Sequence, residues 1–139
     1  MGVDSMYSPN MYELDMERED GTQVHVDLRL TTAGQITLKK HWQENTLSTL
    51  FEAIDDIERF ADVLTQALNW PGNKNPVRKG EELADLMAAN GLLGIVAKQK
   101  IVTELAKASG ILSEEEKAAM DERASKLQDS LTSADEGNA

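Results

Sequence analysis

The chain has 139 residues, no cysteine, and 25 acidic against 14 basic side chains, which gives a net charge of −11. This length suits a single domain and leaves little room for a second hydrophobic core. The negative charge argues against nucleic acid and anionic membrane surfaces as partners. The lack of cysteine excludes disulfides, thiolate nucleophiles and cysteine-based zinc sites.

The N-terminal segment shows no targeting signal. Residues 1–10 lack a basic region followed by an apolar core, and no apolar run in the chain approaches the roughly 20 residues that span a bilayer. We therefore expect a cytoplasmic protein without membrane contact, in which residues 1–10 form a flexible lead.

Two segments near the N-terminus alternate apolar and polar residues with a period of two. One is centred on Leu14 and the other on Val26, and this pattern is typical of strands with one apolar face. Asp20-Gly21 between them favours the positive φ values of a tight turn. We predict a β-hairpin over residues 11–30. Because a lone hairpin is marginally stable, its apolar face must pack on helices or its edge must pair with another strand, including one from a second subunit.

The middle of the chain is predicted to be helical. Residues 36–42 fit a strand or a short helix, and we favour the helix. Asn45 can then cap a longer helix, because its side-chain oxygen can accept a bond from the first free amides. Asp55 and Glu58 have the spacing of a capping box, so this region forms either one helix or two.

Apolar residues recur in this region at alternating spacings of three and four, which indicates one face of a helix held over three heptads. We call these residues the seam: Leu47, Leu50, Ile54, Ile57, Ala61, Leu64 and Leu68. Phe51, Phe60 and Val63 make the stripe broader than that of a two-helix zipper. The seam is therefore predicted to face the core of its own domain.

Prolines and glycines divide the rest of the chain. Residues 70–76 contain two prolines and predict a loop, because proline lacks an amide donor and disfavours helix before it. Helices are predicted over residues 80–89 and 92–108. A further helix begins at the capping box of Ser113 and Glu116.

The predicted fold class is therefore mainly α (α+β), with an N-terminal β-hairpin followed by a compact bundle of about four to five helices. One folded domain is expected over residues 11–131, with its helical region over 33–131. Residues 132–139 are small and polar, which predicts a disordered tail.

No group of residues in the sequence predicts catalysis or metal binding. His25 and His41 have no cysteine or serine elbow to activate. The acidic run at residues 114–116 falls in the first turn of a helix, where carboxylates favourably oppose the helix dipole. We predict a protein that is not an enzyme and has no catalytic residues, no metal and no cofactor.

The hairpin and the last helix are the predicted partner surfaces, because each has an apolar face that the middle of the domain need not cover. The predicted contact residues are Tyr12, Leu14, Val24, Val26, Met120, Leu127 and Leu131. Residues 71–110 hold six basic and four acidic side chains. This basic stretch is either a solvated surface or a docking face for an acidic protein, including a second copy.

Several strings together resemble the tail assembly chaperones of long-tailed bacteriophages, particularly those that infect Gram-positive bacteria. The strings are Asp20-Gly21, Leu28–Gln35 (LRLTTAGQ), Glu44–Leu47 (ENTL), Asp62–Trp70 (DVLTQALNW) and Asn90-Gly91. The resemblance spans about residues 12–112. The segment after Ser113 shows no family pattern.

The resemblance implies a mainly helical protein of the host cytoplasm that forms homo-oligomers and coats the tape measure protein. Major tail protein then polymerises around the tape measure, and the chaperone is absent from the mature virion. The family implies no catalytic residue. An alternative from the charge is a small acidic regulatory protein that binds a single basic host or phage protein.

Overall fold

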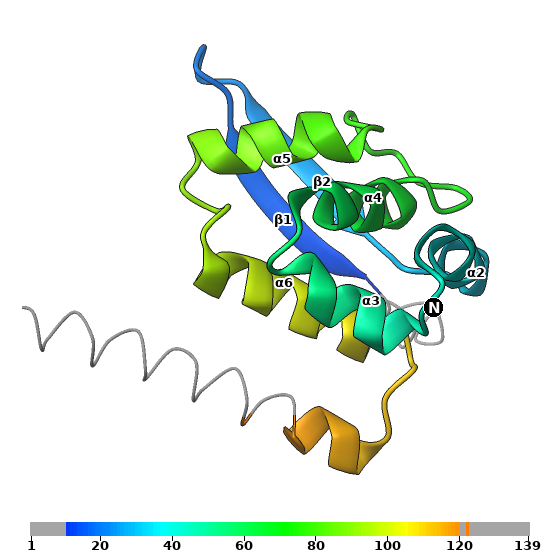
Figure 1. Ribbon diagram of the computed structural model, residues 1–139. Helices are drawn as coiled ribbons and strands as arrows, with labels where there is room; N and C mark the ends of the chain where they lie inside the picture. The colour runs from blue at the N-terminus through cyan, green and yellow to red at the C-terminus, as the bar shows by residue number, and fades with distance from the viewer. Residues whose placement is uncertain (1–10, 120–121, 123–139) are drawn as a thin grey trace, which may run out of the picture.

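The computed structural model consists of an N-terminal antiparallel hairpin followed by helices, and it describes residues 11–119 and 122 (Figure 1). The elements are β1 (Tyr12–Glu17), β2 (Gln23–Leu28), α2 (Thr32–Trp42), α3 (Thr46–Ala53), α4 (Ile57–Leu68), α5 (Gly80–Ala89) and α6 (Ile95–Ala108). Residues 114–119 are also helical. This order confirms the predicted mainly α (α+β) class.

The predicted hairpin forms, with Leu14 opposite Val26. Gly21 has a φ of 87°, and its amide donates to the Arg18 carbonyl at 2.9 Å, which closes the turn. Helices α4, α5 and α6 contact the strands and lie over one face of the hairpin (Figure 1). That face holds the buried side chains Leu14, Met16, Val24, Val26 and Leu28.

The seam is broken into two helices. Asn45 caps α3 as predicted, with its side chain accepting a bond from the Ser48 amide at 2.8 Å. The second cap is Asp56, whose Oδ1 accepts from the amides of Glu58 and Arg59 at 3.1 and 3.3 Å. The chain thus turns over residues 54–56, and the cap lies one residue after the predicted Asp55.

Burial of the seam follows this break. Leu50, Ile54, Leu64 and Leu68 are buried, and Leu47 and Ala61 are half-buried. Ile57, however, is 51% exposed, which corrects its assignment to the core. Because the chain turns between α3 and α4, the apolar residues of the two helices no longer form one continuous face. The buried face of α4 is instead set by Phe60, Val63, Leu64, Ala67 and Leu68.

Helix boundaries were close to those predicted. Helix α5 begins and ends at the predicted residues, whereas α6 begins at Ile95 rather than at residue 92, with Gly94 as its N-cap. The capping box after α6 is present: the Ser113 amide donates to Glu116 Oε1 at 3.0 Å, and the Glu116 amide donates to Ser113 Oγ at 3.1 Å. The predicted boundary between domain and tail lies outside the described residues.

The loop between α4 and α5 binds the outer edge of β2 through Asn75. This buried side chain donates from Nδ2 to the carbonyls of Asp27 and Leu68, both at 2.9 Å. Its Oδ1 accepts from the Asp27 amide at 2.7 Å. Trp70 Nε1 also donates to the Asp27 carbonyl at 2.9 Å. At Asp27, the backbone amide and carbonyl on the outer edge of β2 are therefore hydrogen-bonded by side chains of this loop.

Asn75→Asp is expected to destabilise the protein by about 3 kcal/mol, because it replaces the Nδ2 donor with an oxygen that faces two carbonyls. The change keeps the size of the side chain, so packing is not altered. The free energy of unfolding in urea measures the effect. Asn45→Asp makes the same chemical change at a helix cap, where aspartate accepts as well as asparagine. Equal unfolding midpoints for the two variants would contradict the role given to Asn75.

Candidate binding surfaces

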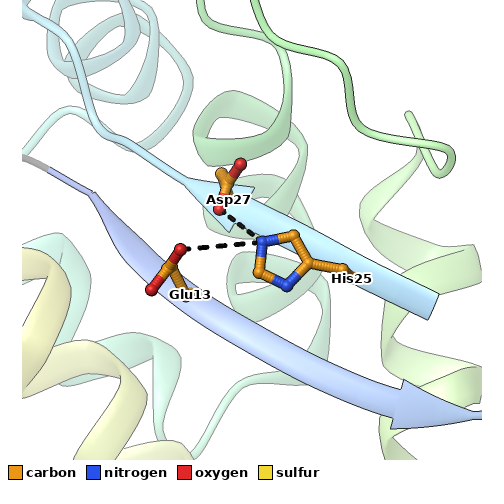
Figure 2. A group of neighbouring side chains, drawn as sticks. All are labelled: Glu13, His25 and Asp27. Atoms are coloured by element: carbon orange, nitrogen blue, oxygen red, sulfur yellow. Dashed lines mark hydrogen bonds and ion pairs between the residues drawn. The ribbon is translucent and has the colours of Figure 1, made fainter. Parts of the chain in front are cut away.

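The face of the hairpin that points away from the helices carries a polar cluster, which we call the His25 cluster: Glu13, Asp15, His25 and Asp27. Figure 2 shows three of its members, Glu13, His25 and Asp27. Strand alternation places these residues opposite the buried apolar side chains. His25 Nδ1 lies 2.6 Å from Asp15 Oδ1, and its Nε2 lies 2.8 Å from Asp27 Oδ1. Glu13 Oε1 is 3.8 Å from the same Nε2. One imidazole thus lies among three carboxylates.

The carboxylates favour the charged form of His25. The hydrogen bond to Asp15, followed by the bond to Asp27, raises the pKa of His25 above its usual value. Both ring nitrogens can donate at once only when the imidazole is protonated. The geometry is therefore that of an imidazolium held between two acceptors, with the His25 side chain still 46% exposed.

Glu13, His25 and Asp27 could each offer one ligand atom to a cation, and these atoms lie within 4.8 Å of one another. One imidazole nitrogen and two carboxylate oxygens would suit a transition metal. The same distances, however, describe an ion-paired histidine on a strand surface, so the geometry assigns no metal. Sequence reasoning did not find this cluster, because the cluster depends on the hairpin register that places Asp15 opposite His25.

The pKa of His25 leads to a prediction for pH dependence. Because this pKa is higher in the folded than in the unfolded chain, protonated His25 stabilises the fold. That contribution is complete below the unfolded value of about 6.5 and is lost as pH rises through the folded pKa. Asp15→Asn is expected to lower the pKa of His25, as measured by an NMR titration of the imidazole Cε1 proton. An unchanged titration would contradict the assigned cause.

Helices α4 and α5 run antiparallel and approach closely. Asn69 Nδ2, after the end of α4, donates to the Arg78 carbonyl at 2.8 Å, and the Gly80 amide donates to Thr65 Oγ1 at 2.8 Å. Thr65 Oγ1 in turn donates to the Ala61 carbonyl at 3.0 Å. These contacts align the start of α5 with the middle of α4.

A groove of about 750 Å³ lies between α4 and α5. Among its lining residues, Ala61, Thr65 and Ala84 have small side chains and are half-buried or buried, so they form its floor. Ile57 from α4 and Leu93 from the loop after α5 add larger apolar surface. The groove is therefore apolar inside, and its largest exposed apolar side chain is Ile57.

The rim of this groove is acidic. Glu58, Asp62, Glu81 and Asp85 all line it. Asp62 Oδ2 accepts from Trp42 Nε1 and contacts His41 Nδ1, both at 2.7 Å, so this carboxylate joins α2 to α4. Among the described residues, Glu58, Glu81 and Asp85 form no side-chain ion pair. Within the part of the chain that the structure describes, these three carboxylates at the rim thus have no cation as partner.

The described contact residues that were predicted from the sequence do not line the groove. Leu14, Val24 and Val26 are buried in the chain's own core, and Tyr12 is half-buried against it. The structure therefore corrects the expectation that the apolar face of the hairpin is left uncovered. The other predicted contacts, Met120, Leu127 and Leu131, lie outside the described residues.

Comparisons with known proteins do not identify this chain. No family model matches the sequence, nor does any curated protein or solved structure. Among the described helices, none is both long and apolar enough to cross a bilayer.

Proposed function

We propose that this protein is a tail assembly chaperone of a long-tailed bacteriophage, which binds the tape measure protein stoichiometrically and without turnover. The observation that carries the proposal is the groove between α4 and α5, with its apolar floor and the 51% exposed Ile57. Such a groove can accept one face of a helix. The strings that resemble these chaperones, including residues 62–70 within and after α4, support the same function.

A long helical client can be bound along its length by many copies of a small protein. A tape measure is a long helix with recurring apolar positions, so it offers many sites of similar kind. Weak sites bound by a homo-oligomer gain avidity and can still be released one by one. Polymerising major tail protein could then displace the chaperone copies even if it bound each site of the tape measure only weakly. In this proposal the chaperone acts in the host cytoplasm and does not enter the mature virion.

Self-association would use exposed apolar side chains rather than the buried hairpin face. Ile36 of α2 is 51% exposed, and Ile95 and Val96 at the start of α6 are 47% and 41% exposed. Light scattering at tens of micromolar should detect oligomers, and Ile36→Ser or Ile95→Ser should shift them toward monomer. A substitution on the hairpin face, such as Val24→Asp, would not test self-association, because Val24 is only 3% exposed and an aspartate there would disrupt the core.

Co-expression with the tape measure protein tests the proposed function. The tape measure alone should be largely insoluble, and the chaperone should keep it soluble and co-purify with it in many copies. Failure of both rescue and co-purification would overturn the proposal. A one-to-one complex with a basic protein, strongly weakened by salt, would instead support the acidic regulatory alternative.

A further inference from the structure

We infer that the groove between α4 and α5 binds a short helix whose apolar stripe is flanked by lysine or arginine side chains. The inference deepens the proposed function and rests on it in one respect, namely that the client is helical. It adds the charge of the docking segment and the surface that receives it. A tape measure segment bound here would be basic along both sides of its apolar stripe.

The dimensions and floor of the groove suit a helix. Its α4 wall runs from Ile57 to Thr65, which at 1.5 Å per residue is about 12 Å, or about two helical turns. Small side chains at Ala61 and Ala84 would allow the backbone of a docked helix to come close. An apolar residue at one position and others three or four residues later would then contact Ile57 and the floor together.

The charge around the groove selects a basic helix. Glu58 stands on the α4 side, and Glu81 and Asp85 stand on the α5 side. Cations on both flanks of one apolar stripe would therefore meet carboxylates on both walls. An acidic helix would be repelled from the same position, so the rim discriminates between partners as well as attracting one.

The acidic surface continues beyond the groove toward the hairpin turn. A second depression, lined by Asp85 and Leu86 of α5 and by the turn residues Arg18, Glu19 and Asp20, shares Asp85 with the groove. Glu82 also lines it. This continuity gives a longer basic segment further carboxylates past the two turns that fill the groove.

The test uses a synthetic peptide of about 18 residues, long enough to form a helix, with leucines at helical spacing and lysines on both sides. Trp42 lines the groove, whereas Trp70 bonds to the Asp27 carbonyl on β2. In a two-dimensional ¹H–¹⁵N NMR spectrum the indole resonance of Trp42 should shift on titration, and that of Trp70 should not. A peptide with glutamates in place of the lysines is the ligand control.

Two sets of substitutions separate the groove from the overall charge. The groove variant carries Glu58→Lys, Glu81→Lys and Asp85→Lys. The control variant carries Glu17→Lys, Glu52→Lys and Glu115→Lys, which change three exposed carboxylates that do not line the groove. Both sets change the net charge equally. The groove variant should bind the lysine peptide at least about tenfold more weakly and should gain affinity for the glutamate peptide, whereas the control should change less than about threefold.

The outcomes distinguish this inference from the proposed function. Equal weakening by both variants, or no shift of the Trp42 resonance, would overturn the inference. If the groove variant still made the tape measure soluble as well as wild type did, the chaperone proposal would stand and the docking site would be wrong. If wild type bound the lysine peptide in the groove but did not make the tape measure soluble, the docking site would stand and the chaperone proposal would fail.

Discussion

Gly80→Ala is expected to destabilise the protein by about 3 kcal/mol, although alanine is the better helix former. A Cβ at Gly80 would overlap the carbonyl oxygen of Ala61 and would lie 2.7 Å from Thr65 Oγ1. Because the obstacle is mainly backbone, no side-chain rotation relieves it. Helix α5 must therefore move away from α4, and the bond from the Gly80 amide to Thr65 weakens.

Urea denaturation of Gly80→Ala beside Gly94→Ala measures this effect. Gly94 has a φ of −76°, and a Cβ there would meet no atom within 4 Å. Its substitution should therefore change the free energy of unfolding by less than about 1 kcal/mol. Similar losses for both glycines would show that α5 does not depend on close contact at Gly80. A Gly80→Ala variant that stays folded should also show a shifted Trp42 indole resonance, because the α5 wall of the groove would have moved.

Local signals in the sequence were sufficient to predict the hairpin and most helix ends. Asp20-Gly21 indicated the turn, in which Gly21 has a positive φ, and Asn45, Ser113 and Glu116 formed the predicted caps. These signals act over a few residues, so the sequence shows them directly. Nothing in the spacing of the seam, by contrast, distinguished one helix from two, because the apolar pattern continues unbroken through the turn at residues 54–56.

The groove could not be predicted from the sequence because it depends on contacts between distant elements. Gly80 gives no local sign that it must lie against Ala61, since both positions suit a helix in isolation. Ile57 likewise belongs to the apolar pattern, but it is the first residue of α4, directly after the Asp56 cap, and it is exposed. For the same reason the sequence suggested partner contacts at Leu14 and Val26, which the later helices cover.

Leu64→Ala is expected to lower the free energy of unfolding by about 2–5 kcal/mol, because Leu64 is fully buried and its truncation leaves a cavity among close-packed side chains. Ile57→Ala is the matched control from the same helix and the same seam. Its side chain is half exposed, so it should cost less than about 1.5 kcal/mol of stability. Urea midpoints of the two variants, measured side by side, test the difference.

The two substitutions should affect binding of the lysine peptide in the opposite order to their effects on stability. Ile57→Ala removes apolar surface from the groove and should weaken the lysine peptide, whereas Leu64→Ala, assayed where it remains folded, leaves the groove surface intact. This contrast separates two parts of the seam, since Leu64 is buried in the core and Ile57 is the contact that we propose for the partner. If Leu64→Ala left the urea midpoint unchanged but abolished oligomers, the buried part of the seam would be an intermolecular surface instead, and the closed core of this fold would be wrong.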